Sequence, residues 1–135
     1  MKKIQLFLLI IFSIGILGFI IFMANFKILD ESKEVIINSK KDSGNTRTAI
    51  LAKSEGNATI NESLNLYISN INNSEEQKEL IFLMSSGYTN EKDIKFYWKN
   101  LDTLVVEYNK DYDVFTKELK TINVNPEVNI EYKAK

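Results

Sequence analysis

The stretch from Ile4 to Met23 constrains this chain more than any other, because it is long, apolar and uncharged. Fifteen of its 20 residues are Ile, Leu or Phe, and none carries a charge. A helix rising about 1.5 Å per residue spans the roughly 30 Å hydrocarbon core of a bilayer in about 20 residues. The sequence therefore predicts that Ile4–Met23 is a transmembrane helix with the lipid bilayer as its partner.

The flanks of this stretch indicate an anchor that is kept. Two lysines before it are typical of a secretory signal. A cleavable signal, however, has an apolar run of about 7–15 residues that ends in small side chains. Here the run is longer and ends at the bulky Phe22, so we expect an uncleaved signal anchor. The leading lysines favour a single-pass cell-membrane protein with its C-terminal part outside the cytoplasm, although Lys27 and Lys33 weaken that bias.

The remainder of the chain has the size of one small domain. We assign residues 1–29 to the anchor, residues 30–34 to a short stalk and residues 35–135 to the domain. After residue 29 the chain has 14 basic and 18 acidic side chains, a net charge of −4. Because an acidic domain is not attracted to phosphate backbones, no nucleic-acid partner is expected.

Short segments with a two-residue alternation of apolar and polar side chains predict a mainly β domain. The expected strands are residues 35–37, 46–53, 64–69, 80–84, 94–98, 104–108, 114–124 and 128–132. Turn-forming residues separate them, including Asp42, Gly44 and Asn45 in a first hairpin and Pro126 before the last strand. A single helical turn is expected at Glu75–Lys78. We expect a small antiparallel meander or sandwich of about seven or eight strands.

The chain lacks both Cys and His, which removes several kinds of chemistry. Disulfides, thiol nucleophiles, Cys-ligated zinc and histidine bases are impossible. The loop Asn109–Asp113 has oxygen ligands at EF-hand spacing, but Val114 and Lys120 replace the required Gly and Glu, so we interpret it as a turn. Ser85–Gly87 lacks the pattern of a nucleophile elbow. We therefore expect no enzyme, no cofactor and no metal site.

The aromatic side chains of the domain suggest two alternatives. One set falls on inward strand positions and is expected to form the core: Phe96, Trp98, Tyr108, Phe115 and Tyr132. The alternative is a binding face lined by Trp98 together with the outward-facing Tyr67 and Tyr97. Both alternatives use Trp98, so sequence alone leaves its role open.

The order of these motifs resembles a family of small membrane-anchored bacterial proteins, domain of unknown function 5412. The likeness covers residues 35–132, and the segments that carry it are Asp42-x-Gly44, Thr46–Lys53, Gly56–Thr59, Ile94-x-Phe96-x-Trp98, Leu104–Tyr108 and Val128-x-Ile130-x-Tyr132. Family members often have a Cys in the loop that corresponds to Ser54–Thr59, where this chain has Glu55. The resemblance implies an anchored β domain and no known activity.

These observations together predict a non-catalytic binding or structural module of the bacterial cell envelope, with an envelope protein or a glycan as its partner. The alternative is an accessory or immunity-type protein that acts on a specific membrane partner through its anchor. A hydrolase that uses a Ser–Lys pair is a third hypothesis, and no motif supports it.

Overall fold

The computed structural model describes residues 2–25, 33–56, 61–71, 77–85 and 89–135. The chain divides into two compact units, Met1–Glu31 and Ser32–Lys135, and each is described by itself. Most of the predicted stalk, half of the predicted helical turn at Glu75–Lys78, and Ser86 and Gly87 of the serine motif lie outside the described residues.

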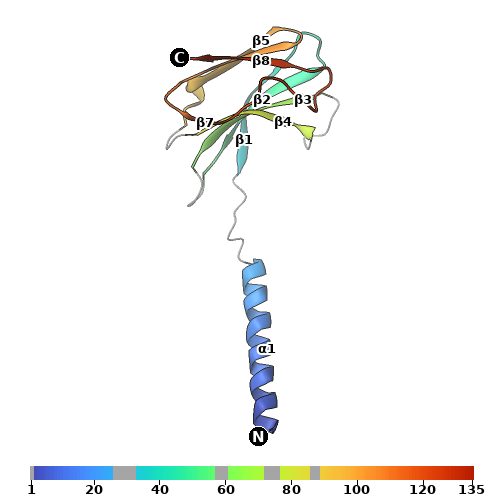
Figure 1. The fold of residues 1–135 in the computed structure, drawn as a ribbon, viewed down its shortest axis with the longest axis vertical. Helices are drawn as coiled ribbons and strands as arrows, with labels where there is room; N and C mark the ends of the chain where they lie inside the picture. The colour runs from blue at the N-terminus through green and yellow to red at the C-terminus, as the bar shows by residue number, and fades with distance from the viewer. Residues whose placement is uncertain (1, 26–32, 57–60, 72–76, 86–88) are drawn as a thin grey trace. The chain divides into compact units, whose positions relative to one another are not determined.

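The first unit contains α1 (Lys2–Asn25), a helix of 24 residues (Figure 1). The helical form predicted for Ile4–Met23 is therefore confirmed. Side chains are described at residues 4, 5, 7, 8 and 11–21, and all of them are exposed. The large apolar ones among them are between 46% (Ile16) and 71% (Phe12) exposed. Within the described residues, no helix was found that is long and apolar enough to cross a membrane.

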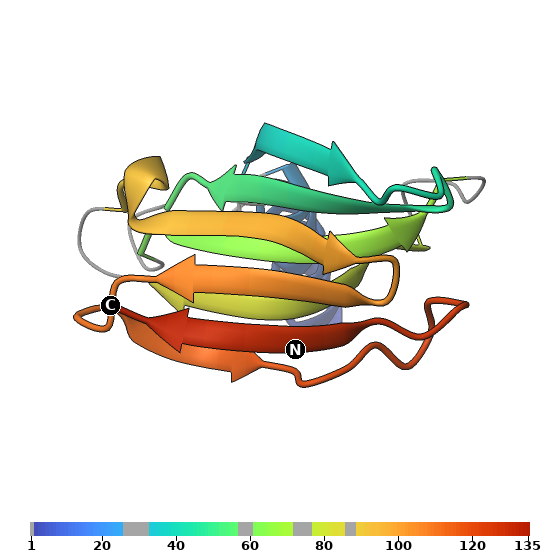
Figure 2. The same ribbon diagram turned by 90° about the horizontal axis from the view of Figure 1, so that it is seen from above.

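The second unit is mainly β and has eight strands within its described residues. In chain order they are β1 (Glu34–Lys41), β2 (Arg47–Ser54), β3 (Ser63–Asn70), β4 (Glu79–Ser85), β5 (Ile94–Asn100), β6 (Thr103–Tyr108), β7 (Asp113–Lys117) and β8 (Asn129–Ala134), with a short 3-10 helix, η2 (Glu91–Asp93), before β5. They form a five-stranded sheet in the order β1-β2-β3-β4-β7 and a three-stranded sheet in the order β5-β6-β8. Figure 2 shows the two sheets as two packed layers.

The prediction of a purely antiparallel domain is wrong for one pair of strands. The five-stranded sheet and the β5/β6 pair are antiparallel, but β8 runs parallel to β6. Between these two strands the chain crosses to the other sheet, forms β7 and returns, as parallel neighbours require. The alternation in Val128–Tyr132 predicts a strand, but it carries no information on the direction of the neighbouring strand.

The strand predicted over residues 114–124 is also shorter than expected, because β7 ends at Lys117. The chain then leaves the five-stranded sheet and runs beside the beginning of β8. There the amide of Ile130 donates to the carbonyl of Leu119 at 2.8 Å, and the amide of Thr121 donates to that of Val128 at 3.0 Å. This crossover joins the two sheets by backbone hydrogen bonds at one edge of the sandwich.

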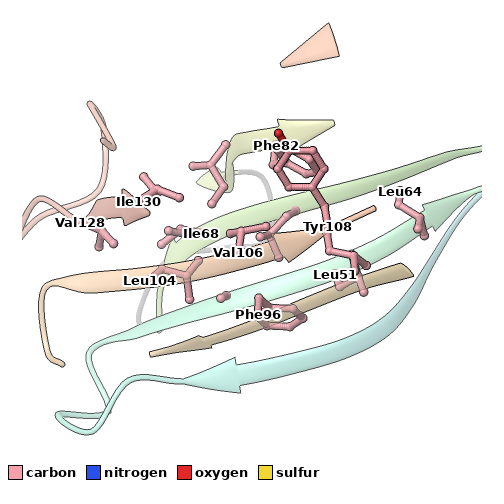
Figure 3. Packing of buried hydrophobic residues seen from close by; sticks show 14 of the residues in the cluster. Leu51, Leu64, Ile68, Phe82, Phe96, Leu104, Val106, Tyr108, Val128 and Ile130 are labelled. Carbon is pink, nitrogen blue, oxygen red and sulfur yellow. The ribbon is translucent and has the colours of Figure 1, made fainter. Parts of the chain in front are cut away.

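The core lies between the two sheets and draws on both (Figure 3). Its buried side chains include Leu51, Leu64, Leu66, Ile68, Phe82 and Met84 from one sheet and Ile94, Phe96, Leu104, Val106, Tyr108 and Ile130 from the other. Burying one such side chain contributes about 1.5–3 kcal/mol. Of the five aromatic residues predicted for the core, Phe96 and Tyr108 are buried, and Trp98 and Tyr132 pack against it half-buried.

Phe115 is the exception, since its side chain is 68% exposed. β7 pairs Val114 with Met84 and Lys117 with Phe82, with a register shift between these pairs. The shift turns Phe115 to the solvent and brings Lys117 over the rings of Tyr108 and Tyr132. The prediction of Phe115 as a core residue is therefore wrong, because the sequence does not reveal the shift.

At one end of the sandwich, a buried ion pair joins three turns of the chain. The first hairpin has the predicted left-handed residue, Asn45, with a φ of 51°. In the same turn, Asp42 accepts hydrogen bonds from the amide and hydroxyl of Thr46 at 2.8 and 2.7 Å and from Nε of Arg47 at 2.9 Å. Gly44 packs so closely on Leu101 that an added Cβ would lie 3.1 Å from its Cδ2.

The guanidinium of Arg47, which is paired with Asp42, also binds backbone carbonyls that flank strands of the three-stranded sheet. Its Nη1 donates to the carbonyls of Pro126 and Glu127 at 3.0 and 3.4 Å, and its Nη2 donates to the carbonyl of Leu101 and to Asp102 at 2.5 and 3.4 Å. The residue is only 2% exposed. The β1–β2 turn, the β5–β6 turn and the segment before β8 therefore share one buried cation.

We call the contacts of Asp42 and Arg47 with the three turns the junction. Its ion pair leads us to expect a specific loss of stability in acid. Burial opposes ionisation of Asp42, but hydrogen bonds from Thr46 and Arg47 outweigh it and lower the pKa to about 2, from 3.8. A lowered folded-state pKa gives stability that is complete above pH 4 and is lost as the pH falls to about 2. The loss is on the order of 2 kcal/mol.

The measurement is urea unfolding of the full chain at pH values from 7 to 2. We expect Asp42→Asn to be less stable at pH 7 and to lack this part of the acid loss, whereas Asp111→Asn, at an exposed turn, keeps it. An acid loss between pH 4 and pH 2 that is the same in Asp42→Asn as in the original chain would contradict the assignment.

Candidate functional site

The structure places the three predicted binding residues on different surfaces. Tyr67 lies on β3, next to the buried Leu66, and therefore faces outward from the five-stranded sheet. Tyr97 follows the buried Phe96 on β5 and faces outward from the other sheet. Trp98 packs half-buried against the core. The predicted face of Tyr67, Tyr97 and Trp98 is thus not assembled, because the sequence does not show that β3 and β5 belong to different sheets.

Trp98 closes a corner of the sandwich. Its Nε1 donates to the carbonyl of Lys40 on β1 at 2.9 Å, and its ring lies under the guanidinium of Arg47, 5.7 Å from the ring centroid. The side chain is half-buried. The core alternative is therefore the one that this geometry favours for Trp98.

The surface around Tyr97 carries a network of charged side chains. Lys133 donates to the hydroxyl of Tyr97 at 3.1 Å, and this bond raises the pKa of Lys133. Glu107 pairs with Lys133 and Lys135, and its pKa is lowered chiefly by its hydrogen bond with Lys135. Lys99 pairs with Glu131 at 2.9 Å. Such exposed pairs contribute little stability.

Tyr67, in contrast, belongs to a polar cluster on the outer face of the five-stranded sheet. One carboxylate oxygen of Glu34 accepts from the hydroxyl of Tyr67 at 2.6 Å and from Nδ2 of Asn65 at 3.0 Å. The other accepts from Nζ of Lys78 at 2.6 Å, and that ammonium lies 4.2 Å from the centroid of the Tyr67 ring. Glu34, at the beginning of β1, is thereby fixed across β3 to the start of β4.

Both acidic groups of this cluster have altered proton affinities. Burial opposes ionisation of Glu34, but hydrogen bonds from Lys78, Tyr67 and Asn65 outweigh it and lower its pKa. Burial and the neighbouring Glu34 carboxylate raise the pKa of Tyr67 to about 12. At neutral pH Glu34 is therefore a carboxylate and Tyr67 a neutral phenol.

A cleft of about 290 Å³ adjoins this cluster through Lys78. Its apolar lining comes from Ile36, Ile50 and Ile71, and its polar lining includes Lys41 and the hydroxyl-bearing Thr48 and Ser69. Ile36 is 56% exposed, although it lies within a strand. An apolar floor with a few polar groups at its border is the usual form of a small-molecule site.

A second hollow, of about 430 Å³, lies between β1 and β5. Ile37 of β1 and Phe96 of β5 line it from the two sheets, and Leu51 of the core contributes to it. Lys92 and Lys95 lie at its border together with Glu91 and Glu107. We call this the edge groove.

Other candidate chemistry has structural roles in the residues described. The hydroxyl of Ser85 donates to the carbonyl of Glu62 at 2.6 Å, so it stabilises a loop. The side chain of Asn109 accepts from the amide of Asp111 at 3.0 Å, which is the geometry of a turn. Within the described part of the chain, no group of three or more acidic side chains is placed to hold a metal ion.

Sequence reasoning identified Tyr67 in this region but missed its neighbours. Ile36 and Ile50 look like ordinary strand residues, and only their cross-strand position shows that they share the outer face. The sequence did contain one signal, the continuous apolar run Val35–Ile37. A strand with one buried face has apolar side chains only at every second position, so this run indicates apolar side chains on the outer face as well.

No family model, no curated protein and no solved structure matches this chain.

Proposed function

We propose that this chain is a single-pass membrane protein whose β unit is a non-catalytic binding module of the bacterial cell envelope. The observation that carries the proposal is α1, which has no charged residue after Lys3 along its 24 residues. Its described apolar side chains are all exposed, and exposed apolar surface of this extent needs a covering such as lipid. The predicted resemblance to domain of unknown function 5412 is consistent with such an anchor.

The binding role is supported by the cleft beside Tyr67. An apolar floor of three isoleucines with Lys41 and Lys78 at its border suits a small ligand that has an apolar body and an anionic group. Catalysis is not part of the proposal, since the neighbouring Glu34 is bound in ion-pair and hydrogen-bond contacts and Tyr67 keeps its proton at neutral pH. The domain would present this cleft outside the cytoplasmic membrane.

The anchor is tested by placing a charge in the helix. We expect the full chain, with a C-terminal tag, to remain in the membrane fraction after carbonate washing. An Ile11→Arg, Ile16→Arg double variant should lose this retention, because each Arg at the centre of a membrane helix costs about 2.5–3.5 kcal/mol. Ile11→Leu, Ile16→Leu is the matched control. Protease added to intact protoplasts should remove the tag, and a tag protected until lysis would reverse the proposed topology.

The cleft is tested with a simple probe, 4-phenylbutyrate, titrated onto the isotope-labelled full chain in lipid nanodiscs. We expect saturable NMR shifts at Thr48 and Ser69. Ile50→Glu, at a half-buried outward position, should abolish them by adding a negative charge to the floor, and Ile50→Leu should preserve them. If Thr48 and Ser69 do not respond in the original chain, or respond equally in Ile50→Glu, the cleft is not the site.

A further inference from the structure

We propose that the edge groove binds an extended peptide strand of a partner protein, with alternating apolar and acidic side chains. Two strand edges border this groove: β1 ends the five-stranded sheet, and β5 ends the three-stranded sheet. Neither has a strand partner on its outer side among the described residues. Figure 2 shows β1 and β5 on the same side of the two layers. Unpaired strand edges are templates for an added strand.

The backbone of β5 shows which groups are available. The carbonyl of Phe96 accepts a hydrogen bond from Nζ of Lys40 at 2.8 Å, so it points away from β6 toward the open edge. Because backbone groups alternate along a strand, Ile94 presents its polar groups on the same edge. The Lys40 ammonium occupies the position of the amide that a neighbouring strand would supply. An added strand would replace this flexible side chain with a backbone donor.

The opposite edge of the sandwich provides a comparison within the same molecule. There the segment after β7 joins β8 through backbone hydrogen bonds at Leu119 and Thr121, and the hydroxyl of Tyr132 donates to the carbonyls of Ile81 and Glu118. At the β1/β5 edge, the contacts that join the strands are side-chain contacts of Lys40 and Trp98 with backbone carbonyls. One edge is closed by the chain itself, and the other is left with a groove.

The side chains around the groove define the partner. Ile37, Leu51 and Phe96 give it an apolar floor, which suits every second side chain of an extended peptide. Lys92 and Lys95 are exposed at its border, with Lys40 beside them. Of the two acidic residues there, Glu107 is neutralised by Lys133 and Lys135, which leaves Glu91 against three lysines. The charge balance therefore favours acidic side chains on the peptide.

The test uses a blocked eight-residue peptide of alternating Val and Glu, titrated onto the labelled full chain in lipid nanodiscs. We expect saturable binding, with NMR shifts and slowed amide exchange at Asn38, Ile94 and Phe96. The matching peptide of Val and Lys should bind at least about tenfold more weakly, a difference of about 1.4 kcal/mol. This groove is separate from the cleft beside Tyr67, so the result does not depend on a ligand for that cleft.

Two matched variants locate the effect. Lys95→Glu should weaken binding of the acidic peptide by about tenfold, while Lys110→Glu, at an exposed turn between β6 and β7, should leave it unchanged. Equal weakening by both variants would show a general charge effect and overturn the proposal. No saturable binding of the acidic peptide up to about 1 mM, or shifts confined to β7, would also overturn it, and the lysines would then serve only to protect exposed edges.

Discussion

The buried guanidinium of Arg47 is the contact on which the arrangement of the two sheets depends. Arginine has five N–H donors in a rigid fork, and here five acceptors surround them: the carboxylates of Asp42 and Asp102 and the carbonyls of Leu101, Pro126 and Glu127. Lysine has three donors and no planar fork, so it cannot replace these contacts. Burying an ion pair adds little net stability by itself, but an unpaired charge left there would cost about 3–5 kcal/mol. The pair therefore penalises any packing that separates the three turns.

The contacts of Arg47 hold the two sheets together at one end of the sandwich, and the groove between β1 and β5 lies farther along the same edge. The indole of Trp98 lies against Arg47 and reaches the carbonyl of Lys40, so the β1/β5 edge is fixed near the junction. Farther along the same two strands, Ile37 and Ile94 line a hollow. The contacts of Arg47 and Trp98 at one end thus hold the edges of β1 and β5 in a defined position along the groove. Recognition surfaces on rigid elements need little ordering when a partner binds, which favours affinity.

Much of the fold could be predicted from the sequence, because period-two patterns report local structure and one buried face. Strands β2, β3, β5 and β6 were predicted close to their observed bounds, and the first hairpin and the helical form of Ile4–Met23 were predicted, although β1 is longer than expected. The parallel pairing of β8, the early end of β7 and the exposure of Phe115 were missed. Each depends on a contact between distant segments or on a register shift, which a local pattern does not encode.

The candidate site was predictable only in part, for the same reason. Tyr67 was identified as an outward aromatic residue, whereas its partners Glu34 and Lys78 lie 33 and 11 positions away in the chain. The role of Arg47 was invisible, since a single arginine among lysines reads as a feature of composition. Its acceptors are mostly backbone carbonyls, and a sequence gives no sign of which carbonyls converge.

The most direct test of this account is a double-mutant cycle between Asp42→Asn and Arg47→Met, followed by urea unfolding of the full chain at pH 7, with sucrose added to keep the single variants folded. The account predicts a coupling free energy of at least about 2 kcal/mol, with the double variant more stable than the single variants predict by addition. A coupling below about 0.5 kcal/mol would show that the two residues act independently, and Arg47 would then not be the contact that holds the sheets together.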